Sequence, residues 1–263
     1  MSKSNRFQSV IWLGLLVILT AMVEGGVSAH VNALSSNASG ESNFPNPNAQ
    51  KRKGHPNPNS VSSAEMKQAD ARLAEMGYGK GHTALIAYQK YEGREVTGRL
   101  SREEFDAIMS ASAPQAKDSG YKHVEIDLDR QVLLLTDADG VVTKVLPVST
   151  GSNKNYNEKG MSGLAYTPRG RFRVYAKISG WRKSPLGMLY YPNYFSDGLA
   201  IHGNSSVPDS PQSHGCIRIP NSAAIEMSRQ TPVGTIILIY DKDSFVSAKA
   251  WAEADKQKEA VNR

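Results

Sequence analysis

The chain has 263 residues, of which 40% are hydrophobic and 21% are charged, as in a soluble globular protein. Its length exceeds the roughly 100 to 150 residues of a typical domain, which argues against a single domain and favours a larger domain with a smaller module. A single cysteine excludes an intrachain disulfide. The formal net charge of +6 favours attraction to an anionic polymer, namely a cell wall, a membrane surface or nucleic acid.

Residues 1–29 have the pattern of a secretory signal peptide. Lys3 and Arg6 give a positive start, Val10 to Val23 is almost unbroken apolar sequence, and Val27-Ser28-Ala29 offers a small-residue cleavage site. An apolar run of about 14 residues would form a helix of about 21 Å, shorter than the roughly 30 Å hydrocarbon core of a membrane. We therefore expect export to the periplasm or cell wall, with a membrane tether only if the segment is retained. Export argues against nucleic acid as a partner.

Residues 30–61 are dominated by Ser, Asn, Gly and Pro, and Pro-Asn-Pro-Asn occurs twice, at Pro45 to Asn48 and Pro56 to Asn59. So few large apolar side chains cannot offset the entropy that is lost when the chain becomes ordered. This stretch is predicted to be a flexible, partly extended linker between the export signal and the folded part of the chain.

Residues 62–112 are predicted to form a small module of three helices. Ser62-Ser63-Ala64-Glu65 fits a capping box at the start of the first helix. The second helix is expected over Thr83 to Tyr91, and Ser101-Arg102-Glu103-Glu104 is a second capping box that begins the third helix. The apolar positions that recur at helical spacing in the first helix are Met66, Ala69, Leu73 and Met76.

The segment 120–241 is predicted to be a mainly β domain, joined to the helical module by a linker at 113–119. Its first strand shows apolar residues at Val124, Ile126 and Leu128 that alternate with three acidic residues. Because successive side chains of a strand point to opposite faces, this pattern predicts a half-buried strand with a polar outer face.

A hairpin is expected after this first strand. Residues 131–136 and 141–148 flank Asp137-Ala138-Asp139-Gly140, in which the glycine can adopt a positive φ. The remaining predicted elements are strands at 170–178 and 235–240, a short helix at 222–230, and a polar amphipathic helix at 242–263.

The single cysteine, Cys216, is the centre of the candidate site. A thiol attacks a carbonyl well only as thiolate, so a nucleophilic cysteine needs a nearby base or a positive field. His202 and His214 are both close in sequence, and extended backbone would place His214, Cys216 and Arg218 on one face. Gly215 permits unusual backbone angles, so that main-chain amides near the thiol can point at a developing oxyanion.

These residues also have ordinary structural interpretations. A buried cysteine can act as a small hydrophobic residue, each histidine can satisfy one buried hydrogen bond, and Gly215 can mark a turn. The occurrence of two histidines, Ser213, Gly215 and Cys216 within one short stretch favours a catalytic site. Further ligands at the spacing of a zinc site are absent from the stretch, so neither a metal ion nor a cofactor is expected.

The motifs around the cysteine resemble the L,D-transpeptidase family, whose signature is a His followed further on by Ser-His-Gly-Cys, a hydrophobic residue and a polar one. Ile201-His202-Gly203-Asn204 and Ser213-His214-Gly215-Cys216-Ile217-Arg218 carry the signature. The resemblance spans about Tyr121 to Asp241. The supporting motifs are Val148-Ser149-Thr150-Gly151, Thr167-Pro168-Arg169-Gly170-Arg171-Phe172 and Gly180-Trp181-Arg182-Lys183-Ser184-Pro185-Leu186-Gly187, with Arg169 where the family more often has a small or hydroxyl residue.

The helical module resembles the peptidoglycan-binding three-helix domain family. Leu73-Ala74-Glu75-Met76-Gly77-Tyr78, Ala87-Tyr88-Gln89-Lys90 and Val96-Thr97-Gly98-Arg99-Leu100 carry this resemblance. The loop between the first two helices, Lys80-Gly81-His82, is shorter than the Asp-Gly loop usual in that family. Glycan binding and a purely structural module are the two alternatives that follow.

Resemblance to the L,D-transpeptidases implies a β-rich sandwich or barrel with few short helices, and a cysteine acyltransferase that acts on peptidoglycan. It implies that Cys216 is the nucleophile and His202 the proton donor and acceptor. His214 and Ser213 would shape the site, and the Gly215 and Cys216 amides would form the oxyanion hole. The candidate substrate-binding residues are Arg218, which would hold a carboxylate unless it forms a structural ion pair, Asn204, Tyr190 and Trp181.

The implied reaction forms a thioester between Cys216 and a tetrapeptide stem, with loss of D-alanine, and transfers the acyl group to an amine. This reaction serves cell-wall organisation, and so cell shape. One alternative is an L,D-carboxypeptidase or endopeptidase, in which water resolves the thioester, and another is a non-catalytic wall-binding protein. A reactive Cys216 is expected to alkylate fast near neutral pH, with a depressed pKa. Carbapenem-type β-lactams are the expected covalent inhibitors.

Overall fold

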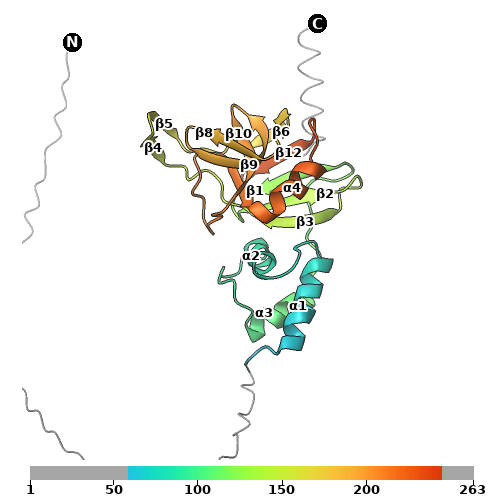
Figure 1. Cartoon of the computed structure of the whole chain (residues 1–263). Coiled ribbons are helices and arrows are strands. Elements are labelled where there is room, and N and C mark those ends of the chain that lie inside the picture. The colour runs from blue at the N-terminus through green and yellow to red at the C-terminus, as the bar shows by residue number, and fades with distance from the viewer. Residues whose placement is uncertain (1–58, 245–263) are drawn as a thin grey trace, which may run out of the picture. The chain divides into compact units, whose positions relative to one another are not determined.

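Residues 59–244 are described by the structure, a computed structural model of the chain (Figure 1). The predicted signal peptide at 1–29, nearly all of the predicted linker at 30–61 and most of the predicted C-terminal helix at 242–263 lie outside the described residues. Between residues 59 and 244, no helix is both long enough and apolar enough to cross a membrane.

Three helices form the first part of the described chain, as the sequence predicts. In the first helix Ala69, Leu73 and Met76 are buried, whereas Met66 is 45% exposed. The predicted apolar face is therefore correct except at its first position. The helices are α1 (Ser63–Glu75), α2 (His82–Tyr91) and α3 (Arg102–Ser110).

The capping box predicted before α1 is confirmed. The Ser62 hydroxyl accepts a hydrogen bond from the Glu65 amide, and the Glu65 carboxylate accepts one from the Ser62 amide at 2.9 Å. The box predicted before α3 is only half formed. Ser101 accepts from the Glu104 amide, but the Glu104 carboxylate pairs with Arg94 at 3.1 Å and so does not return to Ser101.

The first large sheet has five strands in the order β3, β2, β1, β12, β6 (Figure 1). Its first and last segments in the chain, β1 and β12, are parallel neighbours, whereas the other pairs are antiparallel. The hairpin predicted at Asp137 to Gly140 joins β2 and β3, with Gly140 at a φ of 83°. The strands are β1 (His123–Asp127), β2 (Val132–Thr136), β3 (Val142–Pro147), β6 (Gly170–Arg173) and β12 (Ile236–Tyr240).

The second large sheet carries the predicted site. Its strands follow the order β11, β10, β9, β7, and β8 also pairs with β9. Here β10 and β11 are parallel, with His202 opposite Arg218 in the register. A separate two-stranded sheet is formed by β4 and β5. The bounds are β7 (Ala176–Lys177), β8 (Trp181–Ser184), β9 (Gly187–Ser196), β10 (Leu199–Asn204), β11 (Ile217–Pro220), β4 (Asn155–Glu158) and β5 (Met161–Leu164).

One hydrophobic core lies between the two large sheets, and α4 (Asn221–Gln230) contributes to it. A second core lies between α1, α2 and α3 and the opposite face of β2 and β3. The alternating side chains of β2 therefore enter different cores, Leu133 and Leu135 the first, and Val132 and Leu134 the second. The predicted fold class, a mainly β domain preceded by three helices, is confirmed.

The prediction of a polar outer face on β1 is wrong, because every residue of this strand is buried. Glu125 is fully buried, and its carboxylate accepts hydrogen bonds from the Lys117 and Asp118 amides at 3.0 and 2.8 Å. It also accepts from the Tyr240 hydroxyl at 2.8 Å and from the His123 ring at 3.1 Å. The segment before β1 therefore covers an acidic face that the alternation alone assigns to solvent.

His123 forms a buried ion pair with Glu125. Its Nδ1 lies 2.8 Å from the Tyr121 carbonyl oxygen and its Nε2 lies 3.1 Å from the Glu125 carboxylate, and both partners only accept hydrogen bonds. The two contacts therefore stabilise the protonated ring. Burial lowers the pKa of His123, but these two hydrogen bonds outweigh burial and raise the pKa above its ordinary value.

The strand predicted over 170–178 is interrupted. Its first part, β6, pairs with β12 in the first sheet, and its second part, β7, pairs with β9 in the second. The chain crosses between the sheets at Val174 and Tyr175, whose amides bond to Thr235 and Tyr194 respectively. The segment predicted as one strand thus contributes a strand to each of the two large sheets.

Candidate active site

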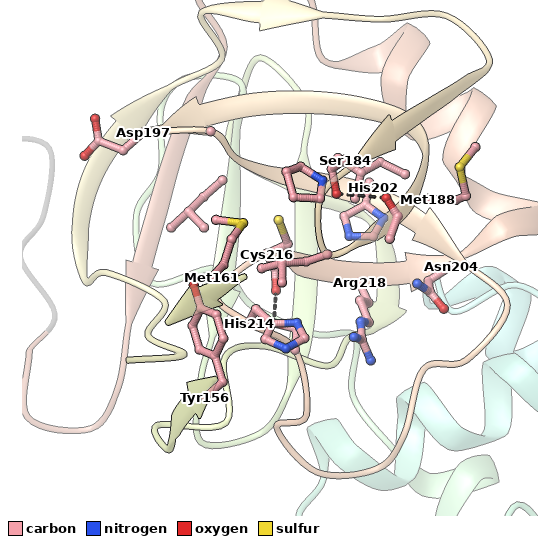
Figure 2. Close-up of a pocket in the computed structure, with 17 residues that line it drawn as sticks. Tyr156, Met161, Ser184, Met188, Asp197, His202, Asn204, His214, Cys216 and Arg218 are labelled. Carbon is pink, nitrogen blue, oxygen red and sulfur yellow. Dashed lines mark hydrogen bonds between the residues drawn. The ribbon is translucent and has the colours of Figure 1, made fainter. Parts of the chain in front are cut away.

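A cavity of about 360 Å³ contains the predicted nucleophile (Figure 2). In this view Cys216 lies near the centre, with His202 on one side and His214 on another, and Arg218 lies between His214 and Asn204. All five side chains line the cavity. Two hairpins flank it, one formed by β4 and β5 and the other by β8 and β9.

The parallel pairing of β10 and β11 brings His202 and Cys216 into this cavity. Ile201 is opposite Ile217, and both are fully buried in the core between the sheets. The neighbouring residues, His202 and Arg218, therefore point to the other face. Cys216 directly precedes β11, at the end of the turn that begins at Ser213.

Ser213 builds the turn that presents the thiol. Its hydroxyl donates to the Cys216 carbonyl at 2.5 Å and accepts from the Gly215 amide at 3.0 Å. Its main chain pairs with the segment that contains Thr150, so the turn is fixed at both ends. The Gly215 amide therefore has the Ser213 hydroxyl as its acceptor in this structure, and the oxyanion hole at Gly215 and Cys216 stays a prediction.

Gly215 is required for conformational reasons. Its φ is 130°, and a Cβ at this position would lie 2.7 Å from the carbonyl oxygen of Tyr166. Its own carbonyl accepts from the Thr167 hydroxyl at 2.8 Å. Gly215 therefore permits a close crossing of two chain segments directly beside Cys216.

The His202 ring is fixed as one tautomer. Nδ1 lies 2.9 Å from the Gly203 carbonyl oxygen, and because a carbonyl only accepts, Nδ1 carries the proton. Nε2 of the neutral ring is then a proton acceptor, and it has no hydrogen-bond partner in the part of the chain that the structure describes. Burial, assisted by the Arg218 charge, lowers the pKa of His202 to about 4, against the smaller opposing effect of the Gly203 hydrogen bond. His202 is therefore neutral at neutral pH.

The Cys216 thiol is protonated in its resting state. Burial raises the pKa of Cys216, and the lowering effects of the Ala200 main chain and the Arg218 charge are smaller. The expectation of a depressed thiol pKa is therefore wrong for this structure. The physical reason is that the adjacent imidazole is itself buried and neutral, so it supplies no positive charge to stabilise a thiolate.

We expect the rate of acylation of Cys216 by a carbapenem to fall at acid pH. The midpoint of this fall should be near pH 4, far below the ordinary histidine pKa of 6.5. His202 loses its proton as the pH rises through about 4, so the neutral base is present from about pH 5 upward. Stopped-flow acylation rates measured from about pH 3.5 to 8 check this result. An acid limb centred near 6.5 would contradict it.

His214 occupies a different position from His202. Its Nε2 donates to the Glu158 carboxylate at 2.5 Å, and its ring packs edge-on against Tyr156 with a centroid distance of 4.8 Å. Both partners belong to β4, whose residues are mostly exposed. His214 therefore connects the turn that contains Cys216 to the hairpin of β4 and β5. His202 is the better candidate for the catalytic base, because His214 is already bound to Glu158.

The predicted substrate-binding residues differ in their surroundings. Arg218 is half-buried in the cavity and forms no ion pair with any residue between 59 and 244, so the alternative of a structural ion pair is excluded there. Asn204 lies at the rim of the cavity. Trp181 is 56% exposed and lines a neighbouring cavity, whereas Tyr190 packs against the core between the sheets and does not line the active-site cavity.

The hairpin of β4 and β5 was not predicted from the sequence, and neither were the two cavity residues that it supplies, Tyr156 and Met161. The signal was weak. The turn is Lys159-Gly160, with φ values of 52° and 74°, whereas Asn-Gly and Asp-Gly are the common sequences for two residues of positive φ. Its strands are almost fully exposed, so they show no apolar alternation.

Comparison with known proteins identifies the class. The family model for the L,D-transpeptidase catalytic domain matches residues 121–239. The crystal structure of an L,D-transpeptidase from Xylanimonas cellulosilytica is 35% identical, with 69% of this chain and 95% of that chain covered and a TM-score of 0.63. These matches agree with a mainly β enzyme domain. The chain belongs to the L,D-transpeptidase family.

More distant solved structures carry the same description. An L,D-transpeptidase from Stackebrandtia nassauensis is 21% identical, with 70% of this chain and 94% of that chain covered and a TM-score of 0.41. L,D-transpeptidase 3 from Mycobacterium tuberculosis, solved with a faropenem-derived adduct, is 15% identical, with 45% and 59% covered and a TM-score of 0.37. No curated protein matched the chain in the corresponding comparison.

Proposed function

We propose that this protein is an exported L,D-transpeptidase that cuts a peptidoglycan tetrapeptide stem and transfers it through a thioester at Cys216. The observation that carries the proposal is the free Nε2 of a neutral His202 in the cavity that also contains the only cysteine. A neutral thiol beside a neutral imidazole suits general-base activation, in which the proton moves as the sulfur attacks.

In the first half-reaction the Cys216 sulfur attacks the carbonyl carbon of the amide between the diamino acid and D-alanine. Its proton passes to His202 Nε2, and the Cys216 amide stabilises the oxyanion. The C–N bond then breaks, His202 returns the proton to the leaving amine of D-alanine, and the acyl group remains on Cys216 as a thioester.

In the second half-reaction an amine of an acceptor stem attacks the thioester. His202 Nε2 takes the proton of this amine, a new amide bond forms, and the sulfur leaves and regains a proton from His202. Arg218 supports this reaction by its position. The Arg218 guanidinium is half-buried in the cavity and has no ion pair within residues 59–244, so it suits the carboxylates of a stem peptide, which it can hold with two hydrogen bonds.

The same site is expected to react with carbapenem-type β-lactams. Sulfur attack on the strained lactam carbonyl would follow the first half-reaction, but the leaving nitrogen stays tethered, so an adduct accumulates. This expectation rests on the family and on the nucleophile. Intact-protein mass spectrometry would detect a single adduct on the wild-type chain and none on Cys216→Ala.

Mass spectrometry of products from disaccharide-tetrapeptide fragments tests the proposed function. The wild-type chain is expected to form a dimer that lacks one D-alanine, and Cys216→Ala is expected to form none. Tripeptide without any dimer would replace the transfer reaction with hydrolysis by water. No product from the wild-type chain, together with no carbapenem adduct, would refute the proposal.

A further inference from the structure

An exposed loop connects the two residues that carry the proposed chemistry. His202 lies in β10, Cys216 lies at the end of the turn before β11, and the loop 205–212 runs between β10 and that turn. No residue of this loop is fully buried, so apolar packing holds it only weakly. Hydrogen bonds from other parts of the chain therefore contribute much to its position.

Ser149 and Lys90 both bind this loop from outside it. The Ser149 hydroxyl donates to the Ser210 carbonyl at 2.8 Å and accepts from the Gln212 amide at 3.1 Å. The Lys90 ammonium donates to the Pro208 carbonyl at 3.3 Å. Ser149 belongs to the β domain, whereas Lys90 lies in α2 of the helical module. The loop is therefore bound by both parts of the protein.

Lys90 also binds the segment that supports Arg218. Its Nζ donates to the Val148 carbonyl at 2.9 Å. The next residue, Ser149, exchanges two main-chain hydrogen bonds with Arg218, at 3.0 and 3.1 Å. A single ammonium thus connects the loop at Pro208 with the segment that is paired to the main chain of Arg218.

The burial of Lys90 makes its hydrogen bonds hard to replace with water. Lys90 is only 4% exposed, because α2 packs against β3 (Figure 1). Burial lowers the pKa of Lys90 to about 8, against the smaller opposing attraction of Asp209, so the side chain is mainly charged at neutral pH. Without this amine the buried Val148 carbonyl would lose a charged donor, and the loop would lose its bond to the helix.

We infer that Lys90 is a positioning residue of the active site, and that the helical module thereby takes part in catalysis. Through the loop it sets the position of Cys216 relative to His202, and through the neighbouring segment it sets the position of Arg218. The inference rests on the proposed function, because alignment is read out as the rate of acyl transfer. A displacement of about 1 Å between reacting groups can lower a rate by roughly a hundredfold, so a side chain remote from the substrate can have a large effect.

Lys90→Met tests this role, because Met has a similar length but donates no hydrogen bond. With disaccharide-tetrapeptide fragments, kcat/KM for transfer should fall roughly ten- to hundredfold, with most of the loss in kcat. Leu73→Ala is the matched control. It opens a cavity in the core between the helices and the first sheet but leaves both hydrogen bonds of Lys90 in place. It is expected to lower the unfolding temperature while kcat stays within about twofold.

NMR of the folded variants gives a second readout that needs no turnover. The amide signals of His202, Cys216 and Arg218 should shift in Lys90→Met and stay in place in Leu73→Ala. Lys90→Gln, which keeps an amide donor of shorter reach, takes the place of Lys90→Met if the latter does not fold. Equal losses of kcat in the lysine variant and the control, or an unchanged kcat in the lysine variant, would overturn the positioning role and leave the transfer function intact. Inactivity of the wild type would instead refute the proposed function.

Discussion

Replacement of His202 by Gln is expected to lower kcat/KM for stem transfer by about a thousandfold or more. The substitution keeps a polar side chain of similar size but removes the neutral imidazole Nε2 that is the proposed proton acceptor for Cys216, and general-base catalysis contributes roughly 10² to 10⁴. The rate of Cys216 acylation by a carbapenem should fall in parallel, because the same proton transfer starts both reactions. Steady-state product formation and stopped-flow acylation measure the two effects.

His214→Gln is the matched control for this substitution. His214 bonds to Glu158 and not to the thiol, so its loss should reduce kcat/KM by no more than about tenfold. A larger loss for His214→Gln than for His202→Gln would reverse the assignment of the base. Thermal unfolding of both variants would establish that neither result arises from loss of the folded state.

The substitution Glu125→Gln is expected to lower the free energy of unfolding by about 3 to 5 kcal/mol. The Glu125 carboxylate accepts four hydrogen bonds and is the buried counterion of His123. An amide in its place would turn one acceptor atom into a donor that faces other donors, and would leave a buried imidazolium without its partner. Urea unfolding followed by circular dichroism measures the loss.

A pH series sharpens this second prediction. The pKa of His123 is raised in the folded protein, so its pairing stabilises the fold fully below the unfolded histidine value of 6.5. This contribution is lost as the pH rises through the folded pKa. The difference between wild type and Glu125→Gln should therefore shrink at alkaline pH. Glu103→Gln is the control, because the Glu103 side chain is 88% exposed and should change stability by less than about 0.5 kcal/mol. A Glu125→Gln variant as stable as this control would contradict the prediction.

Local sequence patterns predict the elements whose signals are local. Capping residues, helical spacing and the Asp137 to Gly140 turn identify α1, α2, α3 and the hairpin of β2 and β3 at nearly their observed bounds. The face of β1 could not be predicted in this way. Its acidic side chains are covered by main-chain amides of the preceding segment. The alternation of side chains along β1 contains no information about these main-chain partners.

In the candidate site, too, some features could be predicted from the sequence and others could not. The residues that meet in the cavity, Cys216, His202, His214 and Arg218, are identifiable because their motif is compact. The protonation states of Cys216 and His202 cannot be predicted from the sequence, because they depend on burial. The hydrogen bond of the Gly215 amide cannot be predicted either, because it depends on which acceptor lies within reach. The packing of Tyr190 against the core between the sheets is likewise not predictable from its sequence position, since an aromatic residue there suits either a core or a binding surface.

The core shared by the three helices and the first sheet limits how these two parts of the protein could have evolved separately. A chain cut at residue 120 would leave Val132, Leu134 and Val145 uncovered and two carbonyls without the Lys90 ammonium. Gene fusion could not easily replace these helices with helices from another protein, because the new helices would need an apolar surface that fits β2 and β3. The boundary near residue 120 that the sequence suggests is therefore a poor site for recombination between this protein and others.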